Sequence, residues 1–382
     1  MRDRLVGTLA VAVAVGACVS TGSVRDPGSP TTSSAPRVPY LSPAWRLNLA
    51  DTGFLLRYRP TESTAPVPRP DGLGVIVGTS DGAIRSVAVR DGAIGWTTRV
   101  GAGVQGRIQV DGDRVFAASD DGFVVALDLM SGAEVWRYRA GGALAAGPVV
   151  AQGRVLFVTD AERIRVLDAD DGRWLWDYGR DPPDRFVLAG ASTPKVVGDR
   201  VIVGFADGTL TSLALEDGAV VWGRDLTAGE REFTDVDSDP CVIGDRVFTA
   251  SWSGGLYAID LDTGEVVWRN PLRAVGNPAP DGDRIWVPAS DGALYAVAVE
   301  DGRTLLARRI TEEGTIGKPI RVGSWWAVAT TDRGVLLFDP DDGSIVQRLD
   351  GGDGVSVAPT MVGRTVVVLS NGGYLYGYRA GG

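Results

Sequence analysis

Histidine is absent from this 382-residue chain. Its absence excludes hydrolases that use a Ser-His-Asp or Cys-His arrangement, and it excludes zinc and non-haem iron sites with His ligands. A general base would have to be Asp, Glu, Tyr, Lys or a cofactor. Lysine is nearly absent as well, because Lys195 and Lys318 are the only two, and the cysteines are Cys18 and Cys241 alone.

Positive charge is also in short supply. The chain has 38 Lys and Arg residues against 48 Asp and Glu residues, which gives a net charge of −10. An acidic surface argues against a nucleic-acid partner and is not attracted to anionic lipid. Beyond the N-terminus, no long window sustains the apolar period of a helix, so the sequence favours strands.

What the chain does have is a motif that recurs seven times and is left unfinished an eighth. Each copy contains a turn such as Asp-Gly or Thr-Gly, and the residue four positions after the turn glycine is usually Trp. The eighth copy, from Gly373 to Arg379, stops before its own Trp, and the missing segment stands at the other end of the chain around Trp45. The Trp position recurs every 38 to 46 residues and holds Trp96, Trp136, Trp176, Trp222, Trp268, Leu306 and Gln347.

A period near 40 residues is typical of propeller blades or helical repeats. Each unit contains short β-branched and aromatic runs, such as 246–250 and 256–260, bounded by Gly, Asp, Ser and Pro. Two-residue turns such as Asp91-Gly92 and upstream Gly-Asp-Arg segments (198–200, 244–246, 282–284) divide each unit into four strands. The sequence predicts an all-β, eight-bladed β-propeller with four-stranded antiparallel blades, closed by an N-terminal strand around Trp45 that completes the C-terminal blade.

We interpret the recurring tryptophans as blade packing rather than ligand stacking. A large flat ring covers the next blade, and its ring N–H needs a hydrogen-bond partner. By this logic Leu306 and Gln347 mark the weakest contacts between blades. The structural residues are Trp45, Trp96, Trp136, Trp176, Trp222 and Trp268.

Blocks of the type Ser80-Asp-Gly-Ala-Ile, followed by Asp91-Gly-Ala-Ile-Gly-Trp96, resemble the PQQ-binding-like propeller repeat. That repeat is found in quinoprotein dehydrogenases and in BamB-like lipoproteins of outer-membrane assembly. The resemblance covers roughly residues 43–382. It implies the propeller fold and leaves the activity open, because one fold supports many functions.

The N-terminus reads as a processing signal. A charged start at 1–4 precedes an apolar run that is too short to span a membrane, and small residues lead to Cys18. This resembles a bacterial lipobox, which implies cleavage before Cys18 and lipid on its sulfur; a plain secretory signal ending near Ala17 is the alternative. We expect a lipoprotein signal peptide at 1–17, a flexible Ser/Thr/Pro/Gly tether at 18–39 and the propeller at 40–382. Cys241, left without a disulfide partner, is expected to be a small buried residue.

The resemblance to quinoprotein alcohol dehydrogenases implies PQQ on the axis, with a Ca²⁺ ion, a catalytic Asp, an aromatic floor and an adjacent Cys pair. This chain has no Cys pair, and its short repeats leave little room for the insertions that build such a site. The run Thr234–Asp239 resembles the opening of a calcium loop, but Pro240 stands where a glycine is needed. We interpret the run as a solvated acidic loop, and we predict no cofactor, no metal and no catalytic residue.

Binding is expected on one face, where loops lead from the outer strand of a blade to the inner strand of the next. Aromatic residues beside arginines in these loops suit a protein or glycan contact, although they could simply cap the funnel. The candidate ligand-binding or partner-binding residues are Arg57, Tyr58, Arg185, Phe186, Arg231, Phe233, Asp235 and Trp252.

The sequence therefore predicts a monomeric, extracytoplasmic protein held at the bacterial cell membrane by a lipid anchor. Our leading hypothesis is that the protein is a non-catalytic scaffold, BamB-like in architecture, that binds an envelope protein or glycan. Two alternatives stay open: a sensor of a small molecule or cell-wall glycan in the central funnel, and an atypical PQQ-dependent dehydrogenase.

Overall fold

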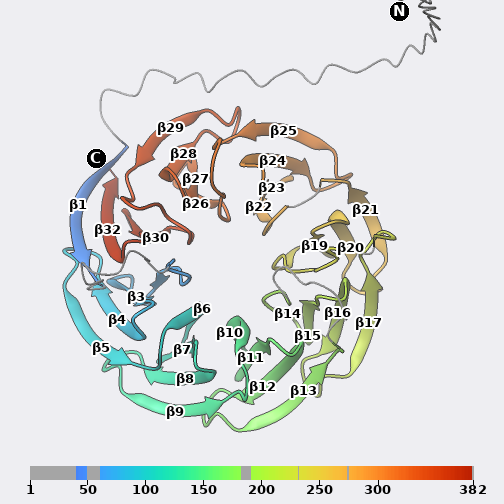
Figure 1. Cartoon of the computed structure of the whole chain (residues 1–382), viewed down its shortest axis with the longest axis horizontal. Coiled ribbons are helices and arrows are strands. Elements are labelled where there is room, and N and C mark those ends of the chain that lie inside the picture. Colours follow the sequence, from blue (N-terminus) through green and yellow to red (C-terminus); the bar gives the residue numbers. More distant parts are fainter. Residues whose placement is uncertain (1–39, 50–60, 182–190, 231, 273–274, 381–382) are drawn as a thin grey trace, which may run out of the picture.

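The computed structural model describes residues 40–49, 61–181, 191–230, 232–272 and 275–380. All regular secondary structure in these ranges is β-strand, arranged as eight four-stranded antiparallel sheets around a central axis (Figure 1). The predicted eight-bladed propeller is confirmed. The signal peptide, the tether and Cys18 lie outside the described residues. Within those ranges, no helix has the length and apolar character to cross a bilayer.

The blades are numbered in chain order, and the strands within each blade are named from the innermost to the outermost. Blades 1 to 4 are β2 (Val67–Pro68), β3 (Gly74–Gly78), β4 (Ala83–Ala88), β5 (Ile94–Arg99); β6 (Val104–Asp111), β7 (Arg114–Ser119), β8 (Phe123–Asp128), β9 (Glu134–Arg139); β10 (Leu144–Ala151), β11 (Arg154–Thr159), β12 (Arg163–Asp168), β13 (Trp174–Gly179); and β14 (Lys195–Val197), β15 (Arg200–Gly204), β16 (Thr209–Ala214), β17 (Val220–Asp225). Blades 5 to 8 are β18 (Cys241–Ile243), β19 (Arg246–Ser251), β20 (Gly255–Asp260), β21 (Val266–Asn270); β22 (Ala279–Asp281), β23 (Arg284–Pro288), β24 (Ala293–Ala298), β25 (Thr304–Arg309); β26 (Ile320–Val322), β27 (Trp325–Thr330), β28 (Gly334–Phe338), β29 (Ile345–Leu349); and β30 (Thr360–Val362), β31 (Thr365–Leu369), β32 (Tyr374–Ala380), β1 (Leu41–Asn48).

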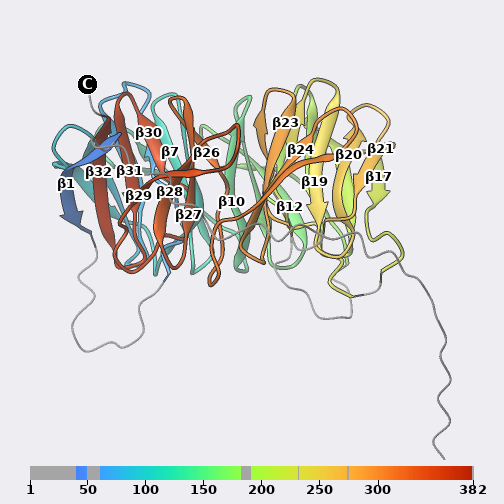
Figure 2. The ribbon, with the colours of Figure 1, turned by 90° about the horizontal axis from the view of Figure 1, so that it is seen from above.

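The core lies between neighbouring blades and is built from the second and third strands of each. These strands are buried on both faces, so they read as near-continuous apolar runs such as β3 and β28. The outer strands alternate instead, as in β9 and β17, because one of their faces meets solvent. Figure 2 shows the ring from its edge, with the strand connections gathered at two opposite faces.

The ring is closed by the N-terminal strand, as predicted. β1 pairs with β32 in antiparallel register from Leu41 opposite Ala380 to Asn48 opposite Tyr374. In Figure 1 the two ends of the described chain lie side by side in this blade. Closure in this manner leaves no blade without its fourth strand.

Each tryptophan of the repeat contacts the hairpin of the following blade. The six indole Nε1 atoms donate to backbone oxygens at 2.8–3.1 Å, for example Trp96 to Leu129 and Trp176 to Leu215. The ring lies directly on the turn glycine: a Cβ on Gly302 would stand 2.5 Å from Trp268. These glycines are therefore required both for their positive φ and for the approach of the indole.

The Gly-Asp-Arg segments do more than mark turns. Arg200 donates to the Leu261 carbonyl that also accepts Trp222, and Arg246 donates to the Val299 carbonyl that also accepts Trp268. One carbonyl of the next blade thus joins two side chains of the preceding one. Where Leu306 replaces the tryptophan, Arg284 still reaches the next blade through the Pro340 carbonyl.

The other departure from the repeat, Gln347, was expected to weaken its blade contact. Its amide instead forms two hydrogen bonds with the next blade: Nε2 donates to the Leu41 carbonyl at 2.7 Å, and Oε1 accepts from the Leu41 N–H at 3.0 Å. The expectation overlooked this because the partner, the start of the closing strand, is more than 300 residues away in sequence.

Candidate functional site: the axial ring and the loop face

The inner strands bring one equivalent residue of each blade to the propeller axis. In six blades the position lies two residues before the first paired residue of the inner strand, such as Cys241 opposite Phe248 or Lys195 opposite Ile202. In blades 2 and 3 it lies two residues before the pair that follows the register irregularity, Gln109 opposite Phe116 and Val149 opposite Leu156. In seven blades a proline follows it; Ile108 stands there in blade 2. We call this set the axial ring: Ala65, Arg107, Gly147, Thr193, Asp239, Asn277, Lys318 and Ala358.

Local backbone features present Arg107 to the axis. Gly106 has a φ of +68°, and the register of β6 is irregular between Gln105 and Gln109. Such an irregularity re-aims the side chains of a strand. The neighbouring ring residue is Gly147, and a Cβ there would lie 2.3 Å from the backbone nitrogen of Arg107. Glycine at 147 thus allows the inner strands of blades 2 and 3 to meet backbone to backbone.

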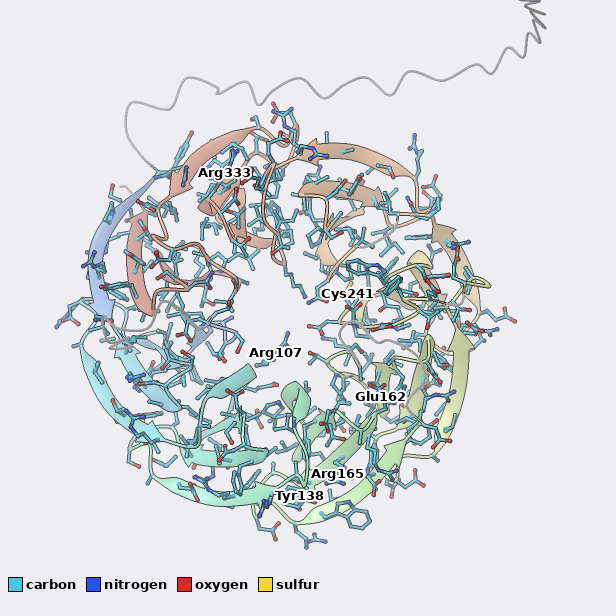
Figure 3. The ribbon with its side chains drawn as sticks, viewed as in Figure 1. Arg107, Tyr138, Glu162, Arg165, Cys241 and Arg333 are labelled. Atoms are coloured by element: carbon cyan, nitrogen blue, oxygen red, sulfur yellow. The ribbon has the colours of Figure 1, made fainter. Side chains whose placement is uncertain are left out.

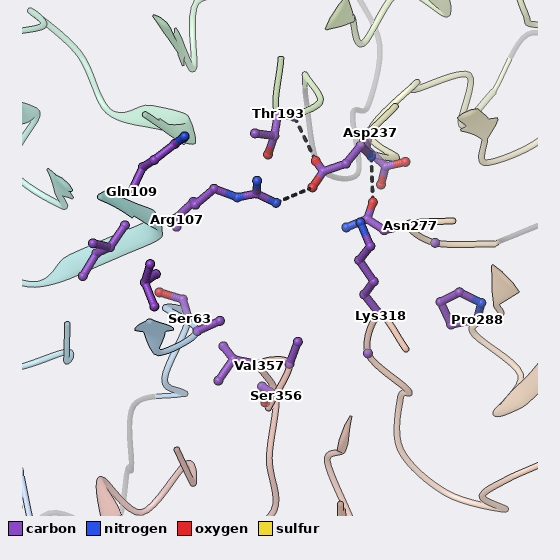
Figure 4. A pocket seen from close by; sticks show the side chains of 18 of the residues that line it. Ser63, Arg107, Gln109, Thr193, Asp237, Asn277, Pro288, Lys318, Ser356 and Val357 are labelled. Atoms are coloured by element: carbon purple, nitrogen blue, oxygen red, sulfur yellow. Dashed lines mark hydrogen bonds and ion pairs between the residues drawn. The ribbon is translucent and has the colours of Figure 1, made fainter. Parts of the chain in front are cut away.

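Asp239 is the most heavily bonded member of the axial ring. Its Oδ1 accepts the Thr193 N–H at 3.0 Å, and its own N–H donates to Asn277 Oδ1 at 2.7 Å. Arg107 reaches it from the other side of the axis, with Nη2 3.6 Å from Oδ2 (Figure 4). This last distance is longer than a hydrogen bond, so the guanidinium is paired only loosely.

These residues surround an open channel with a volume of about 810 Å³. One part of its wall is polar, with Arg107, Thr193, Asp237, Asp239, Asn277 and Lys318, and another is aliphatic, with Val67, Val110, Ile316 and Val357. Figure 3 shows Arg107 and Cys241 near the axis, with Tyr138 and Arg165 farther out. A volume of this size falls within the range of small-molecule sites.

The channel shifts the protonation equilibria of groups beside it. Burial raises the pKa of Asp237 to about 6, and the nearby Asp235 and Asp239 add to the rise. Burial lowers the pKa of the Lys318 ammonium; Asp239 and Cys241 oppose this, whereas Arg107 and Lys195 add to it. Cys241 is buried, as expected, and burial raises the pKa of its thiol to about 11.

Part of the predicted loop site can be located. The loop between β17 and β18 meets the β19–β20 turn, where the Trp252 N–H donates to the Asp235 carbonyl and the Ser253 N–H to the Phe233 carbonyl, both at 3.1 Å. Phe233 is 38% exposed and Trp252 is half-buried, so both are accessible at this face. The other candidates, Arg57, Tyr58, Arg185, Phe186 and Arg231, lie outside the described residues.

The prediction that residues 234–239 form a solvated acidic loop is wrong, as the burial of Asp235 shows. Its side chain is 1% exposed, and Thr234, Val236 and Ser238 are buried too. The acidic side chain of Glu162 is also buried, and it accepts a hydrogen bond from the Ala206 N–H at 2.9 Å. Burial raises the pKa of Glu162, and the negative charges of Asp207 and Asp235 raise it further. Of the three Asp residues in this run, Asp237 and Asp239 line the channel, and Asp235 is buried.

The channel residues do not fit the quinone cofactor of the dehydrogenases. No aromatic side chain is among its described lining residues. In the same ranges, no group of three or more Asp, Glu and Cys side chains is placed to hold a metal ion. Among the described residues, the lining therefore offers no aromatic floor for a quinone, and its two carboxyl groups, Asp237 and Asp239, belong to no larger group that could hold a calcium ion.

The axial ring was missed at the level of sequence, although a signal existed. The residue before the recurring proline varies between Ala, Gly, Thr, Asp, Asn and Lys from one blade to the next. Comparison of the repeats at this one position would have gathered Thr193, Asp239, Asn277 and Lys318. Arg107 would have been harder to find, because its blade lacks the proline.

The comparisons with known proteins agree with this architecture. The family model described as "Outer membrane protein assembly factor BamB" matches residues 80–308. Among solved structures, BamB from Moraxella catarrhalis is similar with a TM-score of 0.77 at 22% identity, over 89% of this chain and 99% of that one. Quinohemoprotein alcohol dehydrogenase from Comamonas testosteroni has a TM-score of 0.69 at 15% identity, and the match covers 90% of this chain and 77% of that one. Sqt1 from Saccharomyces cerevisiae has a TM-score of 0.72 at 10% identity, and the match covers 90% of this chain and 100% of that one.

At these identities the structural likeness shows the fold alone. No curated protein matches the chain in sequence. The family model, however, covers more than half of the residues and spans blades that carry both the tryptophan repeat and Asp239. The chain belongs to the PQQ-like β-propeller family of the outer membrane protein assembly factor BamB.

Proposed function

We propose that this protein is a non-catalytic, extracytoplasmic scaffold that is tethered to the membrane and binds an envelope protein through its loop face. The observation that carries the proposal is the accessible pair Phe233 and Trp252, brought together from two different blade segments by backbone hydrogen bonds. Aromatic residues held on rigid elements are typical anchors of protein interfaces. The BamB family model supports assembly as the context.

The loop face can be tested by site-specific photo-crosslinking in the source cells. A photo-reactive residue at Phe233 should capture a defined envelope protein, identified by mass spectrometry. The matched control is Leu73, which is 70% exposed in the turn between the first two strands of blade 1, on the opposite face. Capture of the same protein from both positions, or of none from either, would contradict the proposal. Loss of the Phe233 product in Trp252→Ala, with the fold intact, would place both residues in one interface.

The membrane tether is tested separately. Cys18→Ala should move the protein from the membrane to the soluble fraction, because the lipid on this sulfur is the proposed anchor. Continued membrane association of the variant would show that lipidation at Cys18 is not what holds the protein. The crosslinking result does not depend on this outcome, since a partner could itself reside in the membrane.

A dehydrogenase remains the competing function, supported by the fold shared with quinohemoprotein alcohol dehydrogenases. The channel residues argue against it for the reasons above. Addition of PQQ and Ca²⁺ with thermal melting would distinguish the two: the scaffold predicts no change, whereas tight binding at 100-fold above Kd would add about 2.7 kcal/mol to stability.

A further inference from the structure

The axial ring is rich in hydrogen-bond donors that no protein group uses. Among the described residues, no hydrogen bond is formed by the Arg107 guanidinium, the Lys318 ammonium, or the Asn277 Nδ2 amide. Lys318 also has no ion pair in this part of the chain, although it is half-buried. The main acceptor of the ring, the Asp239 carboxylate, is already engaged by Thr193 and Arg107.

The Lys318 ammonium is half-buried, and unused donors on such a group are costly unless water or a ligand meets them, whereas the Arg107 side chain is 50% exposed and is open to a ligand. In the channel they converge: Figure 4 shows Arg107 and Lys318 extending inward from different walls, toward the region of Asn277 and Thr193. The net charge of the whole chain is −10, whereas in the channel the two cations, Arg107 and Lys318, match the two acidic side chains, Asp237 and Asp239, so this region carries no excess of negative charge. A guanidinium with its planar fork unfilled is suited to a carboxylate in particular.

We propose that the axial channel binds a small aliphatic carboxylate, with its acid group between Arg107 and Lys318 and its carbon chain against the aliphatic wall. Asn277 Nδ2 completes the donor set. The aliphatic part of the ligand faces Ile316 and Val357, and the channel volume of about 810 Å³ accommodates a molecule of this class. The proposal goes beyond the scaffold role and does not depend on it.

Calorimetric titration of the purified full chain with succinate tests the inference. Saturable binding is expected in the wild type, with Kd weakened at least about tenfold in Arg107→Gln and in Lys318→Gln, because each removes a charged donor. The matched control is Arg99→Gln, which removes one positive charge from a side chain that is 71% exposed on the outer strand of blade 1. Absence of succinate binding, or binding unchanged in both ring variants, would overturn the proposal.

Two further measurements keep the test independent of variant folding. The chain has only two lysines, so acetylation of the wild type followed by mass spectrometry reports on Lys318 and Lys195 separately. Succinate should protect Lys318 and leave Lys195 reactive; equal protection of both, or of neither, would overturn the site. Glycerol 3-phosphate serves as the competing anion, and tighter binding of this phosphate than of succinate would overturn the choice of a carboxylate.

Discussion

The Gln347 amide forms a two-point hydrogen bond with the backbone of Leu41, at 2.7 and 3.0 Å. In the other blades, a side chain of the preceding blade packs on the hairpin that joins the third and fourth strands. In blade 8 these strands are β32 and β1, from opposite ends of the chain, and no hairpin joins Ala380 to Leu41. A carboxamide offers one donor and one acceptor, which match the free N–H and C=O at the start of the closing strand. Glutamine thus suits the one position where no hairpin exists for a tryptophan to cover.

Replacement of Gln347 by alanine should therefore loosen the closing strand. We expect Gln347→Ala to reduce the free energy of unfolding by about 1–3 kcal/mol, through two lost hydrogen bonds and the backbone groups left behind. Guanidinium unfolding measures this. The exposed neighbour Arg348 provides the control: its side chain forms one solvent-exposed hydrogen bond, to the Arg333 carbonyl, so Arg348→Ala should cost less than about 0.5 kcal/mol. Equal losses in the two variants would show that the closing strand does not rely on Gln347.

The turn glycines offer a matched pair within blade 6. Gly302 and Gly282 have similar φ values of +74° and +64°, but only Gly302 lies against an indole; nothing is within 4 Å of a Cβ on Gly282. Both alanine variants should lose about 1–2 kcal/mol through the left-handed backbone. Gly302→Ala should lose about 1–3 kcal/mol more, because Trp268 must move. Thermal unfolding compares them, and equal melting temperatures would refute the close-contact role.

The raised pKa of Asp237 makes stability depend on pH. Its folded-state pKa of about 6 exceeds the ordinary value of 3.8, so the stabilisation is present at low pH and is lost as pH rises through about 6. Asp237→Asn removes this penalty. The variant should exceed the wild type by about 1–2 kcal/mol at pH 8, after allowance for solvent in the channel, and by nothing at about pH 3, below the ordinary pKa of the carboxyl group.

Denaturation at both pH values checks this, with Asp262→Asn as the exposed control; the side chain of Asp262 is 79% exposed. The carboxylates of Asp235 and Asp239 act on Asp237, and Arg107 and Lys318 also face the channel, so Asp237 does not titrate in isolation. A variant whose advantage is the same at both pH values would rule out ionisation of Asp237 as the cause.

The buried thiol of Cys241 should report unfolding of blade 5. Its pKa is raised to about 11, so very little thiolate exists at pH 8, and the side chain is shielded as well. Iodoacetamide should therefore modify native Cys241 at least about 100-fold more slowly than the same residue in guanidinium. Rapid alkylation of the native protein would mean that the inner strand opens readily.

The sequence was sufficient for the architecture because the repeat records it directly. The tryptophans, the turn glycines and the Trp45 segment each have one packing solution, so the blade number and the closure followed. The axial ring could not be derived in the same way. The recurring proline marks the position, but which residues meet across the axis, such as Arg107 and Asp239, depends on strand register and on the local irregularity at Gly106, and the repeat does not record these.

The pattern of the 234–239 run shows a related limit. Alternating Asp residues fit both a solvated loop and a channel wall, and only the three-dimensional path of the loop between β17 and β18 decides between them. Gln347 is a third case, because a residue that breaks a repeat can be judged only against its spatial neighbour. Residues that follow the repeat were predictable, and residues that depart from it required the structure.

The axial ring takes one residue from each blade, at a position that contributes nothing to the tryptophan contacts between blades. A substitution there alters what faces the axis without disturbing the repeat that holds the ring together. Apart from Gly147, where a Cβ would meet the Arg107 backbone, mutation can therefore explore many combinations of charge and size at the other seven sites on an unchanged framework. Relatives with the same blades could differ in the ligand they recognise through these few residues alone.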